Sequence, residues 1–132
     1  MRLCLDTSAY SHFKRGHAHA VDHVGSATWV GIPTIVLGEL EVGYRLGGRT
    51  AANLDELGRF LEHPVVELVG VDRDVARLYA EMVVGLRRRG TPVPTNDIWV
   101  AACAARVGAT LVTYDRHFEL VDRVGVVVLD SG

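Results

Sequence analysis

The chain has little of what marks an exported or membrane-bound protein. Its 132 residues contain two cysteines, Cys4 and Cys103, and no hydrophobic run long enough to span a bilayer. Both cysteines lie in apolar stretches, so we expect reduced core residues rather than a disulfide framework or a zinc motif. The N-terminus starts with a strand-like segment and has no signal-peptide hydrophobic region. We therefore expect a cytoplasmic protein with no membrane association.

Lysine is also scarce. Lys14 is the only lysine, arginine is frequent, and the formal net charge is −2. Arginine suits bidentate contacts with phosphate. Biased codon usage would give the same composition, and we prefer that explanation. Because the chain lacks an overall basic charge, any binding of nucleic acid must rest on local charge.

The sequence does contain a regular alternation of strands and helices within what we expect to be a single domain, residues 1–132. We expect strands at Arg2–Leu5, Thr28–Ile32, Val65–Val69, Leu111–Thr113 and Val126–Leu129. We expect helices from Thr7 or Ser8 to Arg15, over Ala18–Val24, from Pro33 to Gly47, over Arg49–His63, over Asp72–Arg89, and from Thr95 or Asn96 to just before Gly108. This pattern predicts an α/β fold with a central, mainly parallel five-stranded sheet and helices on both faces.

Four carboxylates occupy positions from which they could form one site. Asp6 and Asp115 follow predicted strands, whereas Glu39 and Asp97 lie in or at the start of predicted helices. Open parallel sheets bind ligands beyond the carboxyl ends of their strands, so we expect the four side chains to converge there. Like charges at such distances repel one another, and a divalent cation is the usual solution. Magnesium, or alternatively manganese, is the cation we expect.

Each acid considered alone also has a structural explanation. Asp6 could cap the first helix, Asp115 could belong to a turn, and the helix dipole favours Asp97 in a first turn. Glu39 differs because its neighbours are apolar, whereas Glu41 faces another side of the helix as an ordinary surface acid. The arrangement of all four favours a common site.

Four segments contain these acids, in an order that spans nearly the whole chain. They are LDTS at 5–8, LGEL at 37–40 with a glycine at 43, PTNDIWVAA at 94–102 and LVTYDRHF at 111–118. Together they resemble the PIN-domain ribonucleases, and more closely the VapC toxins of bacterial type II toxin–antitoxin pairs. The chain shows no departure from this family at the four acidic positions.

The resemblance implies a PIN-like fold and magnesium-dependent endonucleolytic cleavage of RNA by metal-activated water. Asp6 and Asp97 would be the principal metal ligands. Glu39 and Asp115 would complete the catalytic set, as further ligands or by holding metal-bound water. The neighbouring residues Thr7, Ser8 and Asn96 would orient carboxylates and waters.

The resemblance also implies partners. The substrate would be RNA, and a VapB-type antitoxin protein would cover the toxin. An apolar groove involving Tyr10, Phe13 and Leu46 would receive the antitoxin. We further expect a homodimer, since a small domain with much apolar helix surface is compatible with one.

Two other functions are conceivable for this set of acids. An aspartyl-nucleophile magnesium phosphatase needs a second aspartate two residues after Asp6, where this chain has Ser8. A catalytically idle PIN-like scaffold that only binds a partner protein is the remaining alternative, and the four intact acids argue against it.

The histidines leave further alternatives open. A zinc site at His17, His19 and His23 is conceivable, although a solvated helix face is preferred. His117 could contact RNA or serve as a capping or surface residue.

Overall fold

A computed structural model describes residues 1–130, and these form one parallel sheet with helices packed around it. The sheet has five strands in the order β3-β2-β1-β4-β5, and every pairing is parallel. The strands are β1 (Arg2–Leu5), β2 (Trp29–Pro33), β3 (Val66–Val69), β4 (Thr110–Thr113) and β5 (Val126–Val128). The helices are α1 (Thr7–Lys14), α2 (Ala18–Ser26), α3 (Thr34–Leu46), α4 (Thr50–Leu61), α5 (Arg73–Arg89), α6 (Thr95–Arg106) and the 3₁₀ helix η1 (Arg116–Leu120).

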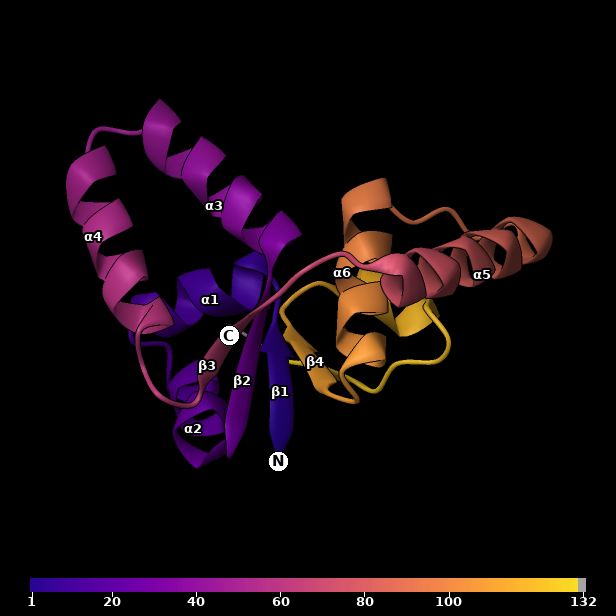
Figure 1. The fold of residues 1–132 in the computed structure, drawn as a ribbon, viewed down its shortest axis with the longest axis horizontal. Coiled ribbons are helices and arrows are strands. Elements are labelled where there is room, and N and C mark those ends of the chain that lie inside the picture. The colour runs from indigo at the N-terminus through magenta and orange to yellow at the C-terminus, as the bar shows by residue number, and fades with distance from the viewer. Residues whose placement is uncertain (131–132) are drawn as a thin grey trace.

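The chain winds in two directions from the centre of this sheet. It passes from β1 through β2 to the edge strand β3, and then crosses back through α5 and α6 to β4 on the other side of β1. Right-handed crossovers therefore place α1 to α4 and α5 to α6 on opposite faces. Figure 1 shows these two groups on either side of the strands. The switch in direction lies between β1 and β4, where doubly wound folds bind ligands.

Burial along β1 confirms that both faces of the sheet are covered. Leu3, Cys4 and Leu5 point alternately to opposite faces, yet each is at most 1% exposed. The predicted five-stranded α/β fold is therefore confirmed, with a sheet that is entirely parallel over residues 1–130. The expectation of reduced cysteines is also confirmed, because Cys4 and Cys103 are buried and unpaired. Burial raises the pKa of the two thiols to about 12 and about 11, respectively.

The structure decides between the possible starts of two helices. Helix α1 begins at Thr7, and its cap is Asp6, as one interpretation of the sequence allowed, rather than Thr7 or Ser8; Asp6 accepts the Ala9 N–H at 2.8 Å. Pro33 ends β2 instead of opening α3.

The start of α6 and the segment after β4 also differ from the prediction. Pro94, not Thr95 or Asn96, precedes α6 in the cap position, and it has no side-chain donor or acceptor with which to cap. Helix η1 was not predicted, since five residues are too short to show a periodic pattern.

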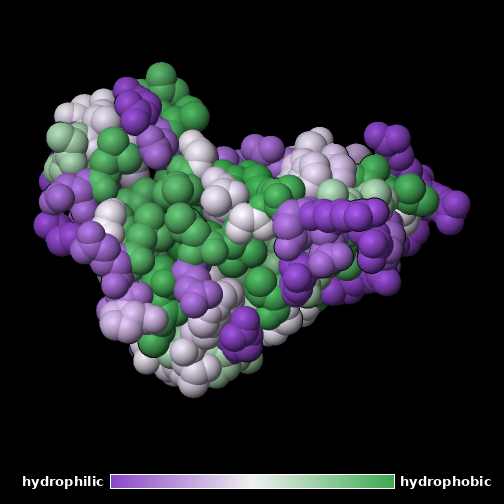
Figure 2. Space-filling view, viewed as in Figure 1, coloured by the Kyte–Doolittle hydropathy of each residue, from purple (hydrophilic) through white to green (hydrophobic). Residues whose placement is uncertain are grey.

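Part of the apolar surface remains exposed. Figure 2 shows hydrophobic residues gathered over the region bounded by α3, α4 and the segment after β3. Exposed hydrophobic residues of α3, β3 and the segment after β3 include Val42, Leu46, Leu68 and Val71, of which Leu46 is 85% exposed. No helix within residues 1–130 has the length and apolar character needed to cross a membrane.

Candidate metal centre

The topology brings the four predicted acids to the carboxyl edge of the sheet. Asp6 directly follows β1, and Asp115 follows the neighbouring strand β4 after a single intervening residue. Asp97 lies in the first turn of α6. The pKa of Asp97 rises to about 6, because burial and the negative charges of Asp115, Glu39 and Asp6 all disfavour its ionised form. The convergence expected from the sequence is therefore present.

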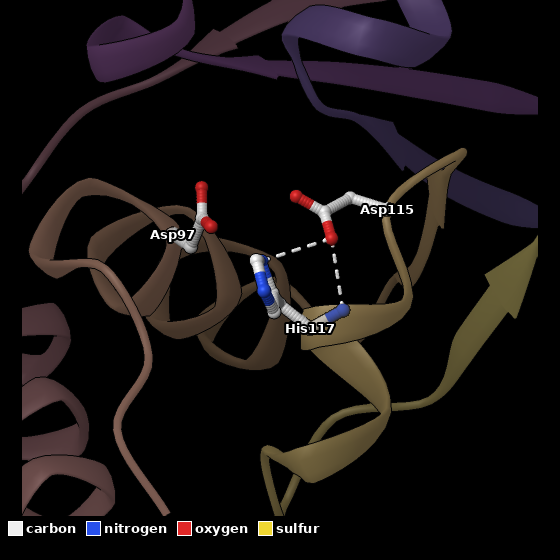
Figure 3. Close-up of side chains that lie close together, drawn as sticks. All are labelled: Asp97, Asp115 and His117. Carbon is white, nitrogen blue, oxygen red and sulfur yellow. Dashed lines mark hydrogen bonds and ion pairs between the residues drawn. The ribbon is translucent and has the colours of Figure 1, made fainter.

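Asp97, Asp115 and His117 form the most compact part of this centre. Each offers one ligand atom, and the three atoms lie within 4.8 Å of one another. Figure 3 shows Asp97 on α6 and the other two residues on the segment after β4. The His117 ring Nδ1 lies 3.0 Å from Asp115 Oδ1, and the His117 backbone N–H donates to the same oxygen at 2.9 Å. His117 thus lies beside the acids and contacts Asp115, whereas the sequence had left open only an RNA contact or a capping or surface role.

Asp6 lies deeper than the other acids and is only 6% exposed. Its Oδ1 accepts the Ala9 backbone N–H and the Ser8 hydroxyl, both at 2.8 Å. Its Oδ2 accepts the Thr113 hydroxyl at 2.5 Å. Burial raises the pKa of Asp6, and these hydrogen bonds act in the opposite direction by favouring the ionised form. The compact cluster does not include Asp6, whose carboxylate also holds the start of α1.

Thr113 joins two of the acids and was missed by the sequence analysis. It is fully buried at the end of β4. Its hydroxyl donates to Asp6 Oδ2 and accepts the backbone N–H of Asp115 at 2.9 Å. One hydroxyl therefore sets the position of Asp115 relative to Asp6. The available signal was a single polar residue that ends the apolar run of β4, beside an acid.

The three residues expected to orient carboxylates each contact one. The Thr7 hydroxyl donates to Glu39 Oε1 at 2.6 Å, and the Asn96 amide donates to Glu39 Oε2 at 3.4 Å. Ser8 donates to Asp6 and accepts the Tyr114 backbone N–H at 3.0 Å. Glu39 is thereby connected to α1 and α6.

The donor set fits a hard divalent cation. It consists of several carboxylates and one imidazole, and oxygen-rich sets of this kind suit magnesium and manganese. Over residues 1–130, no lysine or arginine pairs with Asp6, Glu39, Asp97 or Asp115; His117 is the one group that pairs with Asp115. The mutual repulsion of the acids is therefore left without a compensating protein cation of fixed charge.

The other histidines are engaged differently. His17 lies at the start of α2, and its Nδ1 is 3.2 Å from the Tyr114 hydroxyl. The His23 ring bonds to the His19 backbone carbonyl at 2.8 Å. Within the described part of the chain these histidines form no cluster of three metal-ligating groups, so the zinc alternative gains no support.

Comparison with known proteins places this arrangement in context. A model of the PIN domain matches residues 3–124. Ribonuclease VapC5 of Mycobacterium tuberculosis (strain ATCC 25618 / H37Rv) is 30% identical over 118 residues, which covers 89% of this chain and 86% of that protein.

Solved structures have the same fold. A chain of VapBC2 from Rickettsia felis, solved bound to a promoter DNA fragment, has a TM-score of 0.87 at 22% identity, covering 98% of this chain and 100% of that chain. A chain of VapBC-5 from M. tuberculosis, described as a member of a family of toxin–antitoxin systems, has a TM-score of 0.77 at 28% identity. The match covers 97% of this chain and 98% of that chain. The resemblance drawn from the four sequence segments is confirmed.

The position of Thr113 leads to a stability prediction. Thr113→Val keeps the shape of the side chain but leaves the buried Asp6 Oδ2 and the Asp115 N–H without this partner. We expect it to lower the free energy of unfolding by about 1–3 kcal/mol. Thr110→Val, at the half-buried other end of β4, is the matched control. Urea denaturation would measure both, and equal effects would contradict the role given to Thr113.

The raised pKa of Asp97 leads to a prediction about pH. Because the folded-state pKa of about 6 exceeds the ordinary 3.8, the folded state binds the proton more tightly. Without metal, this residue's contribution to stability is therefore full below pH 4 and is lost as pH rises to about 6. The free energy of unfolding of Asp97→Asn should therefore rise relative to that of wild type by about 1 kcal/mol over this pH window, a value already reduced for solvent screening. If the melting temperatures of wild type and Asp97→Asn in chelator differ by the same amount at every pH, this prediction is contradicted.

Proposed function

The chain belongs to the PIN domain family, and from that premise we propose that it is a magnesium-dependent endoribonuclease, the toxin of a toxin–antitoxin pair. Its similarity to a protein named a ribonuclease and to chains of toxin–antitoxin complexes supports this proposal. The observation that carries it is the set of acids at the carboxyl edge of the sheet, which lack a lysine or arginine partner and which, together with burial, raise the pKa of Asp97.

The residues of this chain would divide the work as follows. Asp97 and Asp115 present carboxylate oxygens to the same space, with His117 beside them, and would hold the cation. Asp6, expected with Asp97 as a principal ligand, lies outside this compact cluster and would join it as a ligand or through a bound water. Glu39 would hold water from the α3 side. A bound divalent cation polarises a phosphate and lowers the pKa of an attacking water. The hydrogen bonds from Thr7, Ser8, Asn96 and Thr113 would keep the carboxylates in place during the reaction.

The partners follow from the apolar surface. We propose that a VapB-type antitoxin protein occupies a groove of about 410 Å³ between α1, α2 and α4, to which Phe13, Val24 and Phe60 contribute. Of the three residues expected in this groove, only Phe13 lines it: Tyr10 is 1% exposed and belongs to the core, and Leu46, which is 85% exposed, lies outside the groove. The exposed residues of α3, with Leu46 the most exposed, suit an interface in a homodimer.

Two further expectations belong to this proposal. We propose a cytoplasmic site of action, where RNA and the antitoxin are both present. We also propose that the chain works as a single domain, in keeping with the one continuous hydrophobic core in residues 1–130. A catalytically idle scaffold would need none of the acids and would retain its function without a divalent cation.

Cleavage of RNA provides the first test. Asp97→Asn should lower kcat/KM about a thousandfold, or about 4 kcal/mol of transition-state stabilisation, because the cation loses a charged ligand. Asp74→Asn is the matched control, since Asp74 also lies in the first turn of a helix, α5, at the surface. Gel analysis of labelled single-stranded RNA with magnesium and with chelator measures both. Cleavage that persists in chelator, or equal activity of the two variants, would count against the metal centre.

Growth of a bacterial host tests the toxin assignment. Induction of the wild-type chain alone should arrest growth, and Glu39→Gln should relieve the arrest, because the substituted side chain loses its charge. Glu41→Gln on the same helix should remain toxic, since Glu41 pairs with Arg45 at the surface. Production together with the antitoxin encoded beside the gene should restore growth in each case. Toxicity that is unaffected by Glu39→Gln would show that it does not arise from nuclease chemistry.

A further inference from the structure

A second cavity lies beside the first turn of α6, apart from the acids. Its volume is about 380 Å³, and it lies between α5, the loop after it and the start of α6. Its lining includes Tyr79, Val83 and Leu86 on α5, Pro92 in the loop, and Thr95 and Ile98 on α6. Pockets of this size hold small ligands, typically with an apolar wall and a few polar groups at fixed points.

One wall of this cavity is a fixed aromatic surface. The Tyr79 ring stacks on Trp99 of α6 with 3.7 Å between ring centroids and 4° between ring planes. A ring held in this way loses little freedom when another flat group packs nearby. The α5–α6 loop is also anchored, because Gly90 ends α5 with a positive φ of 68° and the Thr91 N–H donates to the Leu86 carbonyl at 3.0 Å.

The rim of the cavity carries groups that suit a nucleotide. Arg87 lines it, is exposed, and makes no ion pair with a carboxylate of residues 1–130. A guanidinium in this state is available to a phosphate group. Thr91 and Thr95 also line the cavity; the Thr91 hydroxyl donates to the Leu86 carbonyl at 3.4 Å and keeps the capacity to accept, and a threonine hydroxyl can bond to polar base edges. The pocket thus combines an aromatic wall, hydroxyls and a cation.

The first turn of α6 connects this cavity to the metal centre. Thr95 and Ile98 line the cavity, whereas Asn96 contacts Glu39 and Asp97 belongs to the acid cluster. The two sites are therefore separated by about the width of one helix, roughly 10–12 Å. A few nucleotides of single-stranded RNA can cover that distance.

We propose that this cavity binds an unpaired base of the RNA within a few nucleotides of the scissile phosphate and thereby contributes to the choice of cleavage sequence. The inference rests on the proposed ribonuclease function and assigns part of its specificity. Proteins read single-stranded RNA by packing splayed bases on aromatic side chains and bonding to base edges. Val83, Arg87 and Thr95 are then specificity-determining residues remote from the cation.

The test fills the cavity and removes bases one at a time. Val83→Phe places a ring in the cavity, and Val84→Phe makes the same change on the exposed neighbouring residue of α5. Both are assayed with short single-stranded RNA oligonucleotides, intact or with one abasic nucleotide at successive positions around the cut. For wild type and Val84→Phe, one abasic position should lower kcat/KM about tenfold, the size of one base–aromatic stack. Val83→Phe should show the same fall in kcat/KM on intact RNA, because its ring occupies the place of the base. It should show no further fall on the RNA with the abasic nucleotide.

Further measurements distinguish a failure of the base pocket from a failure of the proposed nuclease function. Arg87→Gln at the exposed rim leaves the core unchanged and should weaken RNA binding, with Arg88→Gln as its control. Fluorescence anisotropy of the same RNAs in calcium buffer reads binding even if wild type cuts none, an outcome that would overturn the nuclease function alone. If Val83→Phe keeps full sensitivity to every abasic position, the base pocket is wrong. A change in the molar mass of Val83→Phe in solution without a change in RNA binding would also overturn it, in favour of an interface between copies.

Discussion

Electrostatic repulsion among neighbouring carboxylates is the constraint on which the rest of this structure depends. Asp6, Glu39, Asp97 and Asp115 come from four separate segments, and burial together with the charges of the other three acids raises the pKa of Asp97 to about 6. Hydroxyl and amide donors hold them there: Thr113 to Asp6, Thr7 and Asn96 to Glu39. These neutral donors fix the geometry without cancelling the charge. The charge therefore remains available for a cation.

The sequence was sufficient for the fold and for the convergence of the acids, for identifiable reasons. Apolar runs separated by amphipathic stretches indicate a parallel sheet, and acids that follow adjacent strands must meet at its carboxyl edge. Details that depend on three-dimensional neighbours were missed. The sequence offered Asp6, Thr7 and Ser8 as caps of α1 without deciding between them, and it gave no sign that Thr113 bonds to Asp6 from a strand far away in the sequence. The place of His117 depends on η1, which is too short to have a pattern.

In the proposed function, helix α6 would link the chemistry to the recognition of substrate. Its first turn carries Asp97 into the acid cluster and Thr95 into the cavity beside α5, and Trp99 on the next turn stacks on the Tyr79 wall of that cavity. A small shift of this helix would move both sites together. The proposed nuclease would then position its scissile phosphate and one neighbouring base with a single rigid element, which suits the need for accurate placement in phosphoryl transfer.

The central claim is that the four acids form one site for a divalent cation. The most direct measurement is an NMR titration of the RNA-free wild-type protein with manganese, whose unpaired electrons broaden signals of nearby nuclei. The account predicts that side-chain signals of Asp97, Asp115 and His117 broaden first and together, followed by Glu39 and Asp6, while His19 and His23 keep their line widths. Broadening that begins at His19 and His23, or no selective broadening at any residue, would contradict it.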